Sequence, residues 1–109
     1  MRILIVDDHP VMRFGVRQLV ERRWPDAELG EAACLAEALE QARTGPWELA
    51  VLDLSLPDAS GVEGLVQLRR AVPTTRLLVL SMHDEAAYAA RALQLGAAGY
   101  LTKEHAINE

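Results

Sequence analysis

The stretch Ile3-Leu-Ile-Val-Asp-Asp-His-Pro10 decides the fold. It opens with four apolar residues, three of them β-branched, which is typical of a short strand buried on both faces. Two aspartates close this run, and a proline then suits the first position of a helix. We therefore expect a buried strand that leads directly into a helix, which is the repeating unit of an α/β sheet.

The same alternation of strand and helix continues along the chain. The expected strands cover residues 2–6, 27–31, 48–52, 76–80 and 98–101. The expected helices cover residues 10–24, 35–43, 61–72 and 85–95. Short connections between alternating elements favour a parallel sheet with helices on both faces, joined by right-handed crossovers. The predicted fold is a doubly wound, five-stranded parallel α/β sheet with the flavodoxin-like strand order 2-1-3-4-5.

Local signals mark the ends of two helices. Ser60 and Glu63 have the spacing of a capping box at the start of the third helix, and Gly96 ends the fourth. Too few residues follow Lys103 to form another helix, although both faces of such a sheet are normally covered. We expect the last helix to be truncated or absent and residues 1–109 to be one domain, the N-terminal piece of a longer protein.

Composition narrows the class of protein. A length of 109 residues suits one domain, and no apolar run approaches the roughly 20 residues of a membrane span. The single cysteine excludes an internal disulfide, which fits the reducing cytoplasm. A net charge of −5 argues against nucleic-acid binding by this segment itself. We expect a cytoplasmic protein without a membrane contact.

Polar side chains follow four of the expected strands. Asp7 and Asp8 end the first strand, Asp53 the third, Ser81 the fourth, and Lys103 lies just beyond the fifth. The carboxyl ends of parallel strands share one edge, and ligands bind there where the strand order reverses. We therefore expect three carboxylates, a hydroxyl and an ammonium group to converge between the first and third strands.

This set of groups suits phosphoryl transfer. Three close carboxylates repel one another, and a hard cation such as Mg²⁺, which prefers oxygen ligands, relieves the repulsion. A carboxylate beside Mg²⁺ and a lysine can act as a nucleophile and form an aspartyl phosphate. The cation and the lysine would neutralise charge on the transferring group.

Four segments together resemble the signature segments of response-regulator receiver domains of two-component systems. They are Ile3-Leu-Ile-Val-Asp-Asp-His-Pro10, Val51-Leu-Asp-Leu-Ser-Leu-Pro57, Leu78-Val-Leu-Ser-Met-His-Asp84 and Gly96-Ala-Ala-Gly-Tyr-Leu-Thr-Lys103. The resemblance covers nearly the whole chain, with the segments in order and correctly spaced. The segments also resemble those of the subgroup that carries a C-terminal LuxR-type helix-turn-helix.

The resemblance implies a metal site and a phosphoacceptor. Asp53 would accept the phosphoryl group. Asp8 would be the main acidic Mg²⁺ ligand, with Asp7 supporting it through water, and Asp53 and the Ser55 carbonyl would also bind the cation.

The resemblance also implies a switch. Ser81 would hydrogen-bond one phosphoryl oxygen, and Lys103 would pair with another. Tyr100 would move inward as Ser81 moves toward the phosphate, because the added charge and acceptor oxygens attract the hydroxyl.

The implied function is signalling rather than enzymatic turnover. A sensor histidine kinase would donate the phosphoryl group, and the domain would hydrolyse its own acyl phosphate slowly. The output would be transcription control through a C-terminal DNA-binding domain, with homodimer formation changed by phosphorylation.

Two residues depart from the family pattern. Glu104 stands where many receivers have a proline after a typically cis bond, so the Lys103–Glu104 bond is either cis and strained or trans with Lys103 displaced. Met82 replaces a small residue and could shield the phosphate. The departure at Glu104, together with the missing last helix, leaves a degenerate, unphosphorylated receiver as an alternative.

A hydrolase with an aspartyl nucleophile is a second alternative. Phosphatases that resemble haloacid dehalogenases place another aspartate two residues after the nucleophile, where this chain has Ser55. A single-domain receiver is a third alternative, but it would need its own last helix.

Several other residues receive structural interpretations. His9 and His83 lack the spacing of a zinc site, and Cys34 fits a small buried residue. Five arginines are expected to lie on solvated helix faces: Arg13, Arg17, Arg69, Arg70 and Arg91.

Overall fold

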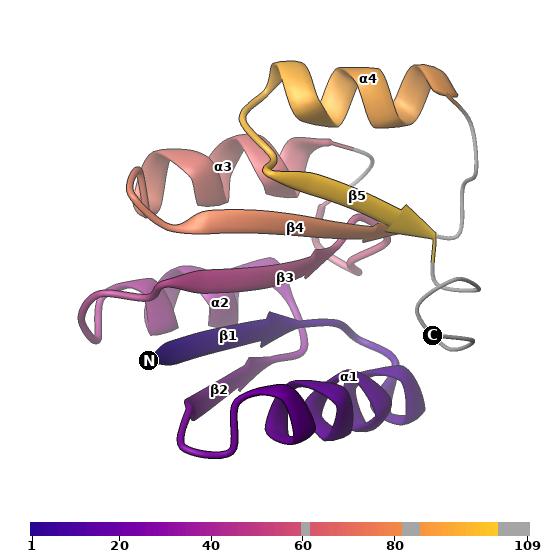
Figure 1. Ribbon diagram of the computed structural model, residues 1–109. Helices are drawn as coiled ribbons and strands as arrows, with labels where there is room; N and C mark the ends of the chain where they lie inside the picture. Colours follow the sequence, from indigo (N-terminus) through magenta and orange to yellow (C-terminus); the bar gives the residue numbers. More distant parts are fainter. Residues whose placement is uncertain (60–61, 82–85, 103–109) are drawn as a thin grey trace.

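The computed structural model describes residues 1–59, 62–81 and 86–102 (Figure 1). Strands and helices alternate along these residues without exception. The first part of the chain forms β1 (Arg2–Val6), α1 (Pro10–Arg23), β2 (Glu28–Ala32), α2 (Leu35–Ala42) and β3 (Leu49–Asp53). The second part forms α3 (Glu63–Ala71), β4 (Arg76–Ser81), α4 (Ala86–Gln94) and β5 (Gly99–Thr102).

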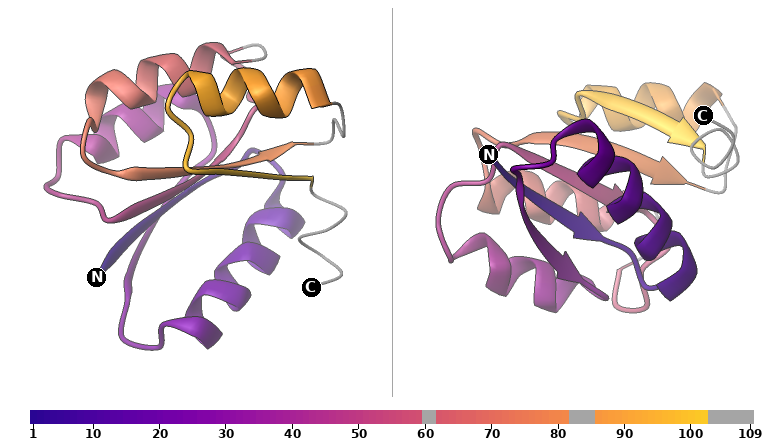
Figure 2. Two further views of the ribbon diagram at one scale, coloured as in Figure 1. Left: turned by 45° about the horizontal axis from the view of Figure 1, so that its top comes forward. Right: turned by 60° about the horizontal axis from the view of Figure 1, so that its bottom comes forward.

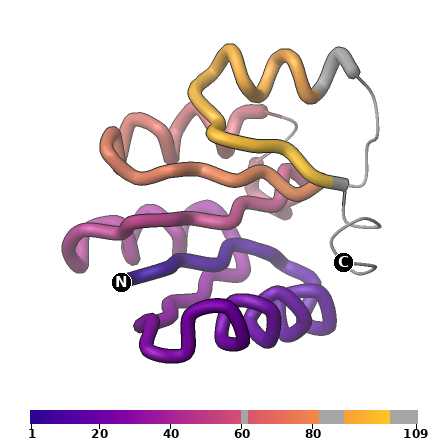
Figure 3. Tube along the Cα trace, viewed as in Figure 1, coloured from indigo at the N-terminus to yellow at the C-terminus, as the bar shows by residue number. Residues whose placement is uncertain are grey.

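The five strands form one parallel sheet in the order β2-β1-β3-β4-β5, which confirms the predicted doubly wound fold. The order reverses between β1 and β3, whose last paired residues are Val6 and Leu52. Next to them, Asp53 pairs with Leu80 on β4. The strand arrows in Figure 1 all point the same way, so their carboxyl ends share one edge of the sheet, and Figure 3 traces the path of the chain in the same view.

Apolar residues alternate between the two faces of the sheet and build two cores. On one face, the buried residues of β1, β3 and β4 pack against α2, α3 and α4, as the side-chain cluster around Leu52, Leu65 and Leu68 shows. On the other face, Ile5 and Val51 pack against α1. Figure 2 shows these layers, and among the described helices α1 alone lies on its side of the sheet.

The expected capping box at α3 is wrong. The helix begins at Glu63, and the preceding Val62 occupies the cap position without a side-chain hydrogen bond. Glu63 is therefore the first helical residue and not the third, as a capping box would require. Its carboxylate still lies in the first turn, where it interacts favourably with the positive end of the helix dipole. Ser60 lies outside the described residues.

The expected end of α4 is confirmed, and it involves an arginine. Gly96 adopts a φ of +105°, a left-handed conformation that favours glycine after a helix. The Arg69 guanidinium donates hydrogen bonds to the carbonyl oxygens of Val72, Thr75 and Gly96. The prediction that Arg69 is merely solvated is therefore wrong, because its charge satisfies carbonyl groups after α3 and α4.

The expectation of a truncated or absent last helix concerns residues 103–109, which lie outside the described part of the chain. Within the part that is described, every helix is too short or too polar to cross a membrane.

Candidate functional site

An acidic cluster lies where the sheet order reverses. Asp7 and Asp8 directly follow β1, and Asp53 is the last residue of β3. One ligand atom from each of these aspartates, and one from His9, lie within 4.8 Å of one another. Asp7 is 2% exposed and Asp53 is 1% exposed, so two of the three carboxylates are buried. The structure thus brings together the three carboxylates, as the strand ends predict.

Backbone and side-chain contacts hold Asp7 in place. Its amide donates to the Ala32 carbonyl of β2 at 3.0 Å, and Arg13 Nη1 donates to its carbonyl at 2.7 Å. Its Oδ1 accepts the His9 amide at 2.8 Å, an arrangement that turns the chain from β1 into α1. Asp7 is therefore held by β2 and by α1.

Asp53 is oriented by the loop that follows it. The Ser55 amide donates to Asp53 Oδ1 at 3.0 Å, and the Leu54 amide donates to the Leu80 carbonyl at 3.3 Å. The first hydrogen bond fixes the carboxylate against its own loop, and the second ties that loop to the end of β4. Ser55, whose carbonyl is a predicted cation ligand, therefore lies in a segment that is anchored at its start.

The His9 ring also reaches the acidic cluster. His9 Nδ1 lies 3.0 Å from Asp7 Oδ1, 3.1 Å from Asp8 Oδ1 and 3.6 Å from Asp53 Oδ2. His9 is the cap residue before Pro10, the first residue of α1. Sequence spacing did not show that the ring turns back toward the strand ends.

The donors of the cluster fit a divalent cation. Asp8 Oδ1 is buried and has no hydrogen bond among the described residues, although His9 Nδ1 lies 3.1 Å away. A buried carboxylate oxygen without a hydrogen bond is unfavourable unless a cation compensates its charge. Three carboxylates on one edge are the hard oxygen ligands that Mg²⁺ and Ca²⁺ prefer.

The predicted phosphate-binding and switch residues lie in part within the described structure. Ser81 ends β4, is fully buried, and pairs in register with Thr102 on β5. Tyr100 pairs with Val79 and packs, half-buried, against the larger core cluster. Four further predictions, which concern Met82, His83, Lys103 and the Lys103–Glu104 bond, fall outside the described residues.

Residues 3–109 match the family model of the response regulator receiver domain. The chain belongs to this family. One relative, the transcriptional activator protein ExaE of Pseudomonas putida, is 37% identical over 103 residues, which are 94% of this chain and 48% of ExaE. The chain thus spans about half the length of this curated relative.

Solved structures of receiver domains share the fold closely. A two-component response regulator of the LuxR family from Aurantimonas is 41% identical with a TM-score of 0.83, over 94% of this chain and 73% of that chain. A response regulator from Burkholderia pseudomallei is 30% identical with a TM-score of 0.84, over 98% of this chain and 62% of that chain. The latter structure contains a phosphorylated aspartic acid, a calcium ion and citrate.

Sequence reasoning missed a clamp between the loop after β3 and α2 of this receiver domain. Asp58 accepts hydrogen bonds from the amides of Leu35 at 2.8 Å and Ala36 at 2.9 Å, which are the first two residues of α2. These two hydrogen bonds hold the pKa of the Asp58 carboxyl below its usual range. The clamp fixes the far end of the loop that carries Ser55, and half-buried Cys34 is the cap residue of the same helix.

Asp58→Asn is expected to make this receiver domain less stable at neutral pH but not in acid. Because the folded-state pKa of Asp58 is lowered, its stabilisation is complete above the unfolded value of about 4 and is lost as the pH falls through the folded value. Urea unfolding should therefore give the variant a lower midpoint at pH 6–7 and a midpoint that approaches that of the wild type below about pH 4.

The matched control is Asp26→Asn, which changes an exposed aspartate in the turn after α1. Its midpoint should follow the wild type across the same pH range. A difference between wild type and Asp58→Asn that did not depend on pH would contradict the ionic origin of the clamp.

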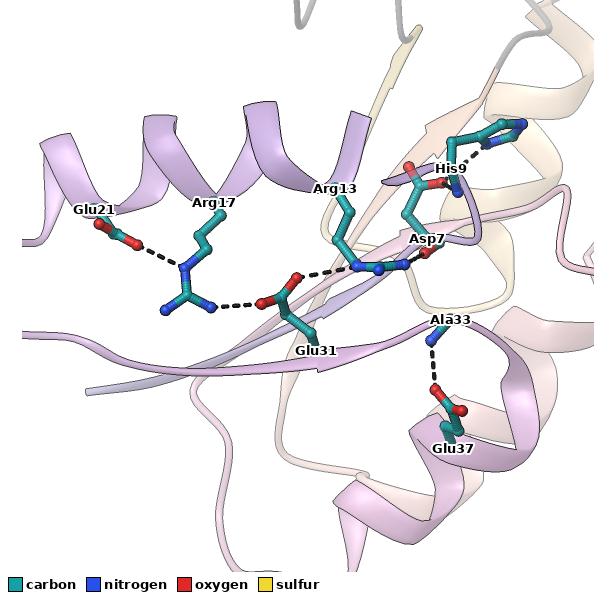
Figure 4. Close-up of polar contacts among 8 residues, drawn as sticks. All are labelled: Asp7, His9, Arg13, Arg17, Glu21, Glu31, Ala33 and Glu37. Atoms are coloured by element: carbon teal, nitrogen blue, oxygen red, sulfur yellow. Dashed lines mark hydrogen bonds and ion pairs between the residues drawn. The ribbon is translucent and has the colours of Figure 1, made fainter. Parts of the chain in front are cut away.

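Two arginines of α1 belong to an ion-pair network (Figure 4). Arg13 Nε and Arg17 Nη1 contact the two carboxylate oxygens of Glu31 on β2 at 3.0 and 2.5 Å. Arg17 also pairs with Glu21 at 2.7 Å, and its hydrogen bonds to Glu21 and then to Glu31 raise its pKa above the usual value. The prediction that both arginines are merely solvated is wrong, and Arg13 links this network to the backbone of Asp7.

Proposed function

We propose that this receiver domain accepts a phosphoryl group on Asp53 in the presence of Mg²⁺. The observation that carries the proposal is the position of the Asp53 carboxylate, which is buried at the reversal point of the sheet beside Asp7 and Asp8. Asp8, Asp53 and the Ser55 carbonyl would hold the cation, with Asp7 acting through water. The bound cation would neutralise charge on the transferring group.

The transfer itself requires an oriented carboxylate. An oxygen of Asp53 forms a bond to phosphorus as the bond to the donor's histidine nitrogen breaks, and the electron pair returns to the imidazole. The hydrogen bond from the Ser55 amide to Oδ1 holds the carboxylate during this step. Ser81, buried at the neighbouring strand end, would donate to one phosphoryl oxygen, and Lys103 would pair with another.

The proposed consequence is a signalling switch and not an enzyme that turns over a substrate. Phosphorylation draws Ser81 toward the phosphate, and Tyr100 on the adjacent strand moves inward. A sensor histidine kinase supplies the phosphoryl group in the cytoplasm, and self-hydrolysis slowly removes it. The output is transcription control by a C-terminal DNA-binding domain, with homodimer formation coupled to phosphorylation. A relative about twice as long, the transcriptional activator protein ExaE, supports this role.

The test is phosphorylation by a small donor. The protein is incubated with acetyl phosphate, with and without Mg²⁺, and its intact mass is measured. We expect a gain of one phosphoryl group that requires Mg²⁺ and that is lost in Asp53→Asn. In parallel, beryllofluoride should change the near-ultraviolet circular dichroism of the wild type only.

The same experiment defines failure. A folded wild type that gains no mass and does not respond to beryllofluoride would contradict the proposal and favour a degenerate receiver. A gain of mass that persists in Asp53→Asn would place the phosphoryl group on another residue.

A further inference from the structure

We propose that His9 is an additional protein ligand of the divalent cation, and that it shifts the preference of the site from Mg²⁺ toward transition-metal ions. The inference rests on the proposed function, since it concerns the same cation site. It adds a nitrogen donor to a set of ligands that otherwise consists of oxygen atoms.

The distances in the cluster are those of ligands around one ion. Neighbouring ligands of an octahedral cation with bonds of about 2.1 Å lie about 3.0 Å apart. His9 Nδ1 lies 3.1 Å from Oδ1 of Asp8, a proposed direct ligand, and 3.0 Å from Asp7 Oδ1, whereas Asp53 Oδ2 is farther away at 3.6 Å. The ring nitrogen therefore stands at a ligand's separation from two carboxylate oxygens of the cluster.

The backbone keeps the ring in this place. The His9 amide donates to Asp7 Oδ1, and Pro10 follows as the first residue of α1, which restricts the His9 backbone to extended conformations. The observed φ of −94° and ψ of 108° are of this kind. The ring makes no capping hydrogen bond to α1, so metal binding would not remove a helix cap.

The ring is also open to the solvent. The His9 side chain is 53% exposed, whereas the Asp7 and Asp53 side chains are almost fully buried. A hydrated ion can therefore reach the carboxylates past the imidazole. In the tautomer that carries its proton on Nε2, the lone pair of Nδ1 is available to a cation in the cluster.

The ligand preferences of metal ions predict which of them an imidazole at this site would favour. Mg²⁺ strongly prefers oxygen ligands and gains little from a ring nitrogen. Co²⁺ and Ni²⁺ bind imidazole well and follow Mn²⁺ in the order of increasing affinity. A site of carboxylates and one imidazole should therefore bind Co²⁺ with a larger advantage over Mg²⁺ than a site of carboxylates alone.

The experiment measures the affinity for CoCl₂ and for MgCl₂ separately by isothermal titration calorimetry. The proteins are the wild type, His9→Gln and His9→Ala, each checked for folding by circular dichroism. Both variants should lose at least about tenfold in affinity for Co²⁺, which is the smallest effect typical for groups that support a metal site. Their affinity for Mg²⁺ should change much less, so that the ratio of the two affinities falls.

Two control proteins remove the other nitrogen and sulfur donors of the chain. The double variant His83→Gln/His105→Gln leaves His9 as the only histidine, and Cys34→Ser removes the only thiol. Both should keep the affinity ratio of the wild type. In the double variant, Zn²⁺ should shift the Nδ1 resonance of the single histidine more than its Nε2 resonance, which identifies the ligating nitrogen.

The outcomes separate this inference from the proposed function. If Mg²⁺ and Co²⁺ bind but substitution of His9 leaves the affinity ratio unchanged, His9 is not a ligand and the proposed function stands. If His83 or His105 carries the preference, the inference is also overturned. If a folded wild type binds neither ion, the proposed function and the inference both fail.

Discussion

Asp8→Ala is expected to lower the affinity of the domain for Mg²⁺ at least about 10–100-fold and to slow phosphoryl uptake accordingly. The Asp8 carboxylate has a buried oxygen without a hydrogen bond among the described residues, and Asp8 lies just beyond the carboxyl end of β1. Its removal takes a full negative charge from a cluster whose remaining members are Asp7 and Asp53. The affinity can be measured by calorimetric titration and the uptake by intact mass after a fixed time with acetyl phosphate.

Asp8→Ala should impair metal binding and phosphorylation without lowering the stability of the domain. Without metal, the substitution removes a carboxylate that lies close to two others, so the free energy of unfolding should not fall. Asp26→Ala, at an exposed turn, is the control and should leave Mg²⁺ binding unchanged. An Asp8→Ala protein that binds Mg²⁺ like the wild type would remove Asp8 from the ligand set, and one that unfolds would give it a structural role instead.

The sheet and the acidic cluster were predictable from sequence because both follow from local patterns. Short β-branched runs alternating with helical stretches determine a parallel sheet, and the reversal of its order fixes which strand ends are neighbours. Asp7, Asp8 and Asp53 could therefore be assigned to one edge without a structure. Their convergence depends only on the topology, and the structure confirms that topology.

Contacts between distant segments could not be predicted in this way. Asp58 caps a helix that begins 23 residues earlier in the chain, and the partner of Arg13 and Arg17 is Glu31, on a different element. No periodicity relates such residues, because their proximity depends on how the loops cross the edge of the sheet. The approach of the His9 ring to Asp53 belongs to the same class, since Asp53 lies on β3.

The failed capping box at α3 has a different cause. The spacing of Ser60 and Glu63 is compatible with a capping box, but the spacing alone does not determine the residue at which the helix begins. Here the loop after β3 forms an isolated bridge between Leu56 and Ala59, and α3 begins only at Glu63. Helix boundaries are therefore less predictable than the existence of the helix, because nearby loop contacts compete with the cap.

Leu68→Ala is expected to lower the free energy of unfolding by about 2–5 kcal/mol, the largest effect on stability among these substitutions. Leu68 is fully buried on α3 and packs in the cluster that covers β1, β3 and β4. The substitution leaves a cavity between helix and sheet, and the loss is a large fraction of the roughly 5–15 kcal/mol that stabilises a domain. Urea unfolding followed by circular dichroism measures the change.

The matched control for Leu68→Ala is Leu19→Ala, which changes a helical leucine of α1 that is 40% exposed. Leucine and alanine have similar helix propensities, so this variant should lose less than about 1 kcal/mol. Because Leu68 lies near the end of α3 that leads into the amino end of β4, the folded fraction of Leu68→Ala should still bind Mg²⁺. Equal losses of unfolding free energy in the two variants would mean that α3 does not contribute to the main core. A loss of Mg²⁺ binding in folded Leu68→Ala would show that packing against the sheet sets the geometry of the acidic cluster.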